Sequence, residues 1–189
     1  MYKFLKKLKI RFTDKEIDKI SNLKRFTRTI KGNKYIVKCD YNRKFFSIKR
    51  NLNHLKILNK YLGKNLPNSF VFVVKLKAKF GNHVRKKKDK YVWKKDNKKT
   101  IKNVMIILSP VIEGKDITKK FIKNCKDTFL INELKCLLKR KLVPDFCTNG
   151  NFLIDKKGKI WYVDSRWPLF TVKQGKDYKR GRDIVNRLR

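Results

Sequence analysis

Positive charge limits what this chain can fold into more than any other feature of its sequence. The 189 residues contain 53 Lys and Arg against 15 Asp and Glu, a formal net charge of +38. Glutamate is especially scarce and occurs only at Glu16, Glu113 and Glu133. Self-repulsion of this size destabilises a compact state unless salt or a polyanion screens it. Nucleic acid, anionic lipid and nucleotide phosphates are therefore the expected classes of partner.

The apolar content nevertheless predicts a folded protein. Hydrophobic residues make up 41% of the chain and aromatic residues 12%, with only 8 Gly and 4 Pro, which is enough material for a core. No apolar run approaches the roughly 20 residues that span a bilayer, and charges interrupt the segment 1–12 too often for a signal peptide. The four cysteines lack metal-binding spacing, so we expect buried, reduced thiols in a cytoplasmic protein. They are Cys39, Cys125, Cys136 and Cys147.

Hydrophobic periodicity predicts both helices and strands. Spacing of three or four residues predicts helices over 14–24, 45–62 and 121–138, the first of them capped by Asp14. Alternating or β-branched runs predict a hairpin over 26–38 with a three-residue turn, and strands over 70–78, 104–108, 151–154 and 159–163. Residues 113–116 are expected to form a polar loop. The chain is therefore expected to be an α+β protein.

The stretch from 75 to 102 holds 13 basic residues and two acids, and it is expected to form a solvated β-hairpin. Its hydrophilic centre offers cations for phosphates, and its tryptophan, set among lysines, offers a ring on which a base can stack. These candidate residues for nucleic-acid or anion binding are Arg85, Lys86, Lys87, Lys88 and Trp93.

Residues 142–170 read LVPDFCTNGNFLIDKKGKIWYVDSRWPLF and differ in composition from the rest of the chain. Asp145 precedes the first predicted strand and Asp164 ends the second, with Asn149 and Asn151 between them. Two carboxylates and an amide at the ends of paired strands form an oxygen-only ligand set that suits Mg²⁺. The alternative is that both aspartates are turn residues that cap a hairpin.

The pattern PDFCTNGNFLID…GKIWYVD resembles the catalytic and metal-binding loops of the protein-kinase-like fold, especially those of small-molecule and lipopolysaccharide-type kinases. The resemblance implies that Asp145 orients the substrate hydroxyl or accepts its proton. It also implies that Asn151, or Asn149, binds Mg²⁺ together with Asp164, and that the ion bridges the phosphates of ATP.

The upstream order resembles the same fold. KGNKYIVK looks like the glycine-loop hairpin that leads to a phosphate-binding lysine, which makes Gly32 and Lys38 candidate nucleotide-binding residues. VMIILSPVIEGKDI is similar to the strand and hinge that hold adenine, which adds Glu113. The resemblance is collinear over 26–170, and the ordered set is more specific than any one motif.

The sequence also departs from that pattern. Asn151 lies one residue beyond the usual spacing from Asp145, and Pro144 stands where a His or Arg is usual. Residues 41–63 contain no acid, so the helix expected there cannot supply the glutamate that normally pairs with the lysine. Asn51 and His54 are the polar residues of that helix that are candidates to orient Lys38 instead.

The resemblance implies a two-lobed protein-kinase-like fold of the α+β class with a truncated C-terminal lobe. Residues 1–108 would form a β-rich N-terminal lobe with one long helix, and 109–189 a reduced C-terminal lobe that carries both loops. Only 25 residues follow Asp164, which disfavours a peptide-binding platform.

The sequence thus predicts an ATP- and Mg²⁺-dependent phosphotransferase acting on a hydroxyl of a non-protein, anionic acceptor. The alternative is a non-catalytic nucleic-acid-binding protein, either on a degenerate kinase-like fold or on another one. A third interpretation is docking of the segment 1–12 to an anionic membrane surface.

Overall fold

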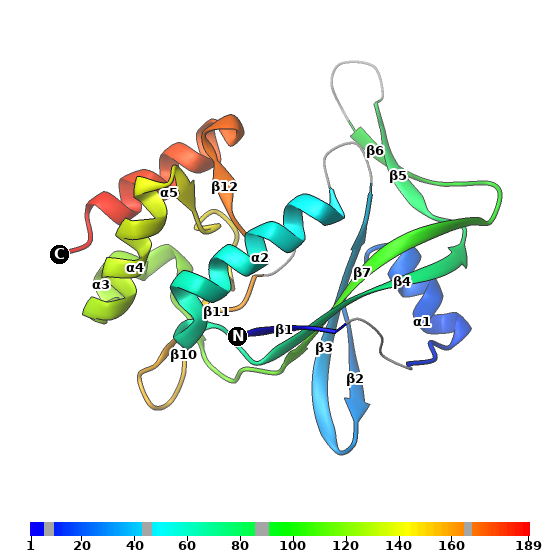
Figure 1. Cartoon of the computed structure of the whole chain (residues 1–189), viewed down its shortest axis with the longest axis horizontal. Coiled ribbons are helices and arrows are strands. Elements are labelled where there is room, and N and C mark those ends of the chain that lie inside the picture. Colours follow the sequence, from blue (N-terminus) through cyan, green and yellow to red (C-terminus); the bar gives the residue numbers. More distant parts are fainter. Residues whose placement is uncertain (6–9, 43–46, 86–90, 165–167) are drawn as a thin grey trace. The chain divides into compact units, whose positions relative to one another are not determined.

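Two units, each assembled from segments far apart in the sequence, make up the α+β fold (Figure 1). The computed structural model describes residues 1–5, 10–42, 47–85, 91–164 and 168–189. Unit 1 comprises Met1–Lys3, Asn51–Ser69 and Pro110–Arg189. Unit 2 comprises Phe4–Arg50 and Phe70–Ser109. The last crossing between the units, after Ser109, lies next to the lobe boundary expected from the sequence, whereas 51–69 was expected in the N-terminal lobe.

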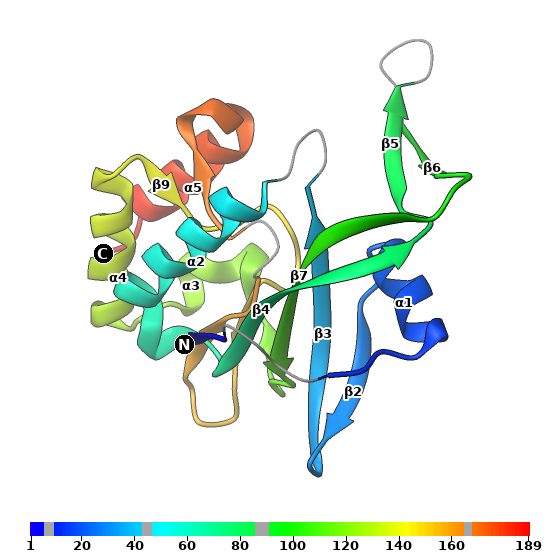
Figure 2. The same cartoon turned by 45° about the vertical axis from the view of Figure 1, so that its right-hand side comes forward.

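The largest sheet has five strands in the order β1-β4-β7-β3-β2. The strands are β1 (Tyr2–Phe4), β2 (Phe26–Ile30), β3 (Asn33–Tyr41), β4 (Ser69–Ala78) and β7 (Thr100–Pro110). Strands β4 and β7 pair antiparallel from Phe70↔Leu108 to Ala78↔Thr100, and Figure 2 shows them as two long neighbouring strands. The predicted strands 70–78 and 104–108 are confirmed as the central parts of this pair.

The predicted hairpin over 26–38 is confirmed, but its turn is one residue shorter than expected. Asn33 pairs with Ile30, which leaves Lys31 and Gly32 as the whole connection. Both have positive φ, 47° and 76°, which is the conformation of a type I′ turn. This turn matches the twist of the flanking strands, and glycine adopts its backbone angles without strain.

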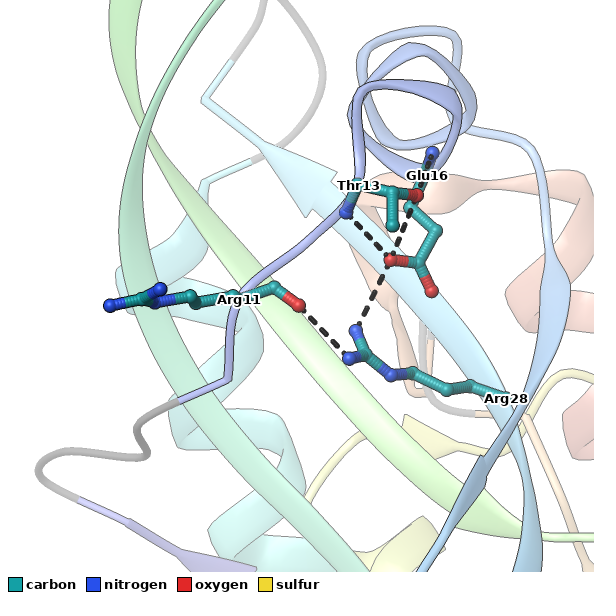
Figure 3. Close-up of polar contacts among 4 residues, drawn as sticks. All are labelled: Arg11, Thr13, Glu16 and Arg28. Atoms are coloured by element: carbon teal, nitrogen blue, oxygen red, sulfur yellow. Dashed lines mark hydrogen bonds and ion pairs between the residues drawn. The ribbon is translucent and has the colours of Figure 1, made fainter.

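Helix α1 (Asp14–Ser21) is capped by Thr13 rather than by Asp14. The Glu16 N–H donates to Thr13 Oγ1 at 3.3 Å, and the Thr13 N–H donates to Glu16 Oε2 at 2.9 Å (Figure 3). Arg28 from β2 joins this capping box through an ion pair to Glu16 at 3.3 Å. The helix ends three residues earlier than predicted, just before Leu23 with φ 56°.

The core of unit 2 lies on the sheet and under α1. Its most buried members come from α1, β3 and β7, and Ile20, Val37, Val104 and Ile106 are each 0% exposed. Strands β5 (Gly81–Arg85) and β6 (Tyr91–Lys95) form a separate two-stranded hairpin, which confirms the hairpin predicted in this region.

Unit 1 holds the remaining helices and short strands. The helices are α2 (Ile48–Leu62, which enters the unit at Asn51), α3 (Phe121–Asn124), α4 (Thr128–Lys139) and α5 (Lys176–Asn186). Short 3₁₀ helices are Gly63–Asn65, Thr118–Lys120 and Val172–Gln174. The strands are β8 (Lys115–Asp116), β9 (Leu142–Val143), β10 (Phe152–Ile154), β11 (Ile160–Tyr162) and β12 (Phe170–Thr171).

The prediction of one helix over 121–138 is wrong, because the chain divides into α3 and α4. Cys125 has an extended backbone that ends α3, and Asp127 begins α4 by accepting a hydrogen bond from the Leu130 N–H at 3.0 Å. The apolar residues keep their helical spacing across this break. Periodicity therefore cannot detect it, whereas a capping aspartate can.

Strands β10 and β11 form the predicted hairpin, and β8 pairs with the outer edge of β10. Asp155 holds the hairpin turn: Oδ1 accepts from the Lys157 and Lys159 N–H groups, each at 2.9 Å, and Oδ2 accepts from Trp161 Nε1 at 2.9 Å. The Trp161 bond is the main cause of the lowered pKa of Asp155. The polar loop expected over 113–116 is thus partly a strand.

Stacked aromatic rings make the core of unit 1 and support the segments around this hairpin. Phe146 stacks on Phe152 at 4.7 Å, and Phe152 lies 4.8 Å from Tyr162 and 4.5 Å from Phe121. All four side chains are at most 1% exposed. This packing fixes the chain on both sides of Asn151.

All four cysteines are free, but the expectation that all are buried is wrong. Cys39 and Cys125 are buried, Cys147 is half-buried, and Cys136 on α4 is exposed. Among the described residues no helix is long and apolar enough to cross a membrane.

Candidate functional site

Three polar side chains are buried near one end of the β10–β11 hairpin. Asp145, Asn151 and Asp164 are only 4%, 4% and 5% exposed. Asn151 immediately precedes β10, and Asp164 follows β11 by two residues. The Val163 N–H donates to the Asn151 carbonyl at 2.8 Å, which extends the pairing of the two strands. The backbone thereby brings Asn151 next to the residue that precedes Asp164.

The amide of Asn151 connects the hairpin to the loop before it. Its Nδ2 donates to the Asp145 carbonyl at 3.1 Å. Asn149, the other asparagine of the loop, is exposed. Of the two candidate amides, Asn151 is therefore the one that lies with Asp145.

The Asp145 carboxylate organises the loop that follows it. Oδ1 accepts from the Cys147 N–H at 2.7 Å and from the Thr148 N–H at 3.1 Å, and Oδ2 accepts from Thr148 Oγ1 at 2.7 Å. These are the bonds of a turn-capping aspartate, the alternative that the sequence left open. They occupy three of about four acceptor positions of a carboxylate, so one position stays available.

Tyr162 on β11 lies among these groups and is 0% exposed. Its Oη accepts from the Asp145 N–H at 3.2 Å and donates to the Pro168 carbonyl at 2.8 Å. The pKa of Tyr162 is raised well above its ordinary value, first by burial and then by the negative charge of Asp164, with a smaller contribution from Asp145. Both aspartates thus act on one buried phenol.

The N-terminal strand and α2 hold the backbone at Asp164. The Tyr2 hydroxyl donates to the Asp164 carbonyl at 3.2 Å. Asn59 of α2 in turn binds Tyr2 through both of its amide atoms, at 2.6 Å to the N–H and 2.7 Å to the carbonyl. Nothing in the local sequence of either residue indicates this role, since the partners are 57 and 162 positions apart.

A second network that sequence reasoning missed supports Asn151 from β8. Asp116 Oδ1 accepts from the Thr118 N–H at 2.9 Å, and Thr118 Oγ1 accepts from the Phe152 N–H at 3.0 Å. Burial raises the pKa of Asp116, but hydrogen bonds from Thr118 and from the Gly150 N–H outweigh it, and the pKa is lowered. The signal available beforehand was the Asp-Ile-Thr spacing, which is typical of a local Asx turn.

The candidate nucleotide-binding residues are not all in the same unit. Lys38 is buried on β3, 5% exposed, and Gly32 forms the β2–β3 turn, so both belong to unit 2. Glu113 belongs to unit 1 and is exposed. The adjacent Gly114 packs so closely on β10 that an added Cβ would lie 2.8 Å from the Ile154 carbonyl oxygen. The hinge-like segment therefore runs along the β10 backbone.

The candidate anion-binding residues lie on the β5–β6 hairpin. Arg85 is the last residue of β5, while Lys86, Lys87 and Lys88 lie outside the described residues. Trp93 on β6 is half-buried, and its ring packs against Gly81 and the core of unit 2. The Trp93 ring thus has a packing role, and its stacking on bases stays a prediction.

The oxygen donors of this site fit Mg²⁺ better than they fit a transition metal. Asp145, Asn151 and Asp164 contribute carboxylate and amide oxygens, and Mg²⁺ usually takes one or two carboxylates together with substrate phosphates. No cluster of three or more His, Cys, Asp or Glu side chains suited to a metal ion occurs in the described ranges. A Mg²⁺ ion held here would need further oxygen ligands, such as those of phosphates.

The chain matches no protein-family model and no curated protein.

Proposed function

We propose that the chain is an ATP- and Mg²⁺-dependent phosphotransferase of a two-lobed, protein-kinase-like fold, acting on a hydroxyl of a non-protein, anionic acceptor. The observation that carries the proposal is the burial of Asp145, Asn151 and Asp164 around one end of the β10–β11 hairpin. Buried carboxylates of like charge are costly unless a cation compensates them. Their order along the chain is that of the motif in the resemblance.

The strand pairing around the motif supports the proposal. Strand β12 pairs with β9 through Phe170↔Val143, which closes the segment between them into one loop-hairpin-loop unit. Asp145 and Asp164 both lie inside this closed segment. A rigid support for both loops is what positioned catalysis requires.

Asp145 is proposed to orient the acceptor hydroxyl through its remaining acceptor position. The hydroxyl oxygen attacks the γ-phosphorus of ATP, the bond from that phosphorus to the ADP oxygen breaks, and the hydroxyl proton passes to Asp145. The three hydrogen bonds from Cys147 and Thr148 hold the carboxylate in one orientation for this step. Catalysis of this kind rests on positioning and on charge stabilisation.

Asn151 and Asp164 are proposed to hold Mg²⁺, which neutralises charge on the phosphates when bound. The Asn151 Nδ2 donates to the Asp145 carbonyl, and this bond fixes the orientation of the amide group. The carbonyl of Asp164 is held by Tyr2, so the backbone that carries the second ligand is also fixed.

The anionic character of the acceptor follows from the net charge of +38. A surface of this sign repels polycationic acceptors and raises the local concentration of anionic ones. Anionic glycans, lipids and nucleic-acid hydroxyls fit this requirement, whereas aminoglycosides do not.

Nucleotide binding tests the proposal directly. The melting temperature of the full chain is measured with ATP or a non-hydrolysable analogue, with Mg²⁺ and with EDTA. We expect a nucleotide-dependent rise that requires Mg²⁺, because a ligand that binds the native state stabilises it by mass action. The Asp164→Asn variant should lose the rise.

The matched control is Asp183→Asn, which removes a half-exposed carboxylate of α5 in the same unit. This variant should keep the full Mg²⁺-dependent rise. A wild-type chain that shows no Mg²⁺-dependent nucleotide binding, or an Asp164→Asn variant that binds as the wild type does, contradicts the proposed function.

A further inference from the structure

The outward face of α2 is a stripe of lysines that the proposed phosphotransferase does not use. Lys56, Lys60 and Lys64 follow at intervals of four residues and are all exposed. Four residues of α-helix rise about 6 Å and return to nearly the same side, so Lys56 and Lys60 lie in line on α2. Lys64 follows in the 3₁₀ helix Gly63–Asn65 directly after α2. The helix contains no acid, which was a departure from the kinase-like pattern. The exposed lysines and the absence of acids together indicate that this face of the helix binds an anionic partner.

The opposite face of α2 is fully committed to the core. Leu55, Leu58 and Leu62 are each 0% exposed. An interfacial membrane helix must bury its apolar face in lipid, and α2 has no apolar face left for that purpose. Its exposed residues are lysines, one arginine and one asparagine.

Two aromatic rings flank the lysine stripe, and each has a cation over it. The Arg140 guanidinium lies 5.4 Å and the Lys60 ammonium 5.7 Å from the centre of the Tyr61 ring. The Lys64 ammonium lies 4.5 Å from the centre of the Phe129 ring, which is 42% exposed. Tyr61 is half-buried. These contacts place α2 beside both ends of α4, whose position Figure 1 shows.

The facing side of α4 contributes one acid to this surface. Phe129, Glu133, Cys136 and Arg140 succeed each other at helical spacing of four, three and four residues. Glu133 is half-buried, and it opposes four cations: Lys56, Lys60, Lys64 and Arg140. The surface therefore stays strongly positive. About 16 Å of helix separates Phe129 from Arg140.

We propose that this lysine–aromatic face, made of Lys56, Lys60, Tyr61, Lys64, Phe129 and Arg140, binds single-stranded nucleic acid. The lysine line contacts successive phosphates, and the two rings stack on bases. Cations interleaved with accessible rings are what sequence-tolerant single-strand binding uses, whereas a duplex hides the faces of its bases. The proposal does not rest on the phosphotransferase site, since no residue of the face belongs to it.

An anionic membrane is the competing partner, because Ile122 on α3 and Phe129 are 39% and 42% exposed and close to lysines. Composition favours nucleic acid, because no large hydrophobic side chain of α2 is exposed beside Lys56 and Lys60 to insert into lipid. Phosphatidylserine vesicles therefore enter the experiment as a direct comparison.

Charge removal is the first test. Binding of a fluorescein-labelled oligodeoxythymidylate of about 20 nucleotides to the full chain is followed by anisotropy over a series of salt concentrations. The Lys56/Lys60/Lys64→Gln variant should bind at least about tenfold more weakly at about 150 mM NaCl. It should also lower the slope of log K against log salt by about 2, since each single-strand phosphate contact contributes about 0.7.

The matched control removes three exposed lysines from another part of unit 1, as Lys173/Lys176/Lys179→Gln. It loses the same formal charge and should change the slope by less than about 0.5. If the two triple variants lose the same affinity for the oligonucleotide, binding depends on net charge alone, and that result overturns the proposal.

Base stacking is the second test. Phe129→Ala should weaken oligonucleotide binding about 5- to 150-fold, the value of one stacked base, and leave the salt slope unchanged. A base-free deoxyribose-phosphate strand should bind wild type and variant alike. Tyr61→Leu provides an independent variant with the same expectation. The proposal is contradicted if these variants bind the oligonucleotide and the base-free strand equally weakly. It is also contradicted if they bind vesicles more weakly than the wild type while their oligonucleotide binding is unchanged.

Discussion

Two regions of the chain use their polar residues in opposite ways. The segment 143–170 carries four basic and three acidic residues, a net charge of +1, whereas 41–63 carries six basic residues and no acid. In the first, Asp145, Asn151 and Asp164 are at most 5% exposed. In the second, the lysines of α2 extend into solvent.

The two regions differ in how their side chains contribute to stability: the first holds buried side chains with hydrogen-bond partners, and the second holds exposed lysines. Asp145 and Tyr162 hold several backbone atoms in place, so their removal leaves buried donors without acceptors. Lys56 is exposed, so its removal leaves no buried donor or acceptor without a partner. The activity proposed for the hairpin is therefore coupled to stability, while the binding proposed for the α2 face can be removed without loss of stability.

The largest expected effect is on Asp145→Ala. Two N–H groups and the Thr148 hydroxyl lose their acceptor, so the free energy of unfolding should fall by about 3 kcal/mol. Urea denaturation followed by circular dichroism measures it. Asp145→Asn keeps an acceptor oxygen and should lose about 1 kcal/mol. An alanine variant as stable as the wild type would show that the carboxylate does not organise this loop.

Thiol reactivity tests the burial of Cys147, which lies in the first region, against the exposed Cys136 of α4. Burial, with smaller contributions from Asp177 and Asp145, raises the pKa of Cys147 to about 11, and burial raises that of Cys125 to about 11. Against an ordinary value of 9.0 this lowers the thiolate fraction at neutral pH about a hundredfold. Iodoacetamide followed by peptide mass mapping should therefore label the exposed Cys136 first.

The pH dependence of this labelling has a defined direction. Because the pKa is raised, Cys147 stays a thiol through neutral pH, and its labelling rate should rise about tenfold per pH unit from pH 8 up to about pH 11. Urea-unfolded protein, in which burial is lost, should label Cys125 and Cys147 as fast as Cys136. Rapid labelling of Cys147 in the native chain at neutral pH would be the contrary result.

A smaller effect is expected for Tyr162→Phe. The change removes the acceptor of the Asp145 N–H and the donor to the Pro168 carbonyl inside the core, so we expect a loss of about 1–2 kcal/mol. Chemical denaturation again measures it, with Tyr178→Phe on α5 as a control that should cost less. A loss equal in both variants would mean that the hydroxyl network adds nothing beyond packing.

The smallest effect on stability is expected for Lys56/Lys60/Lys64→Gln. Exposed substitutions away from buried networks change the free energy of unfolding by less than about 0.5 kcal/mol, and at low salt relief of self-repulsion should make the change stabilising. Thermal denaturation at low and high salt measures both. A loss above about 1 kcal/mol would show that the lysines support the fold, which would remove the distinction between the two regions.

Local patterns predicted the elements that are determined by local residues. The β10–β11 hairpin follows from its two strands and from the turn predicted at Lys157 and Gly158, and the β2–β3 hairpin follows in the same way. Patterns of this kind did not separate α3 from α4, because apolar spacing continues through the break. They also misplaced the cap of α1, which depends on the side chains of Thr13 and Glu16.

The sequence by itself determined the charge excess, the acid-free helix and the order Asp145, Asn151, Asp164, because composition and order are properties of the chain. Only the tertiary structure decided that Asn151 rather than Asn149 lies against Asp145, and that Tyr2, Asn59 and Thr118 support the site. The physical reason is that a buried donor or acceptor takes whichever partner the packing brings within about 3 Å. Such partners are often remote in sequence, so no local sequence pattern predicts them.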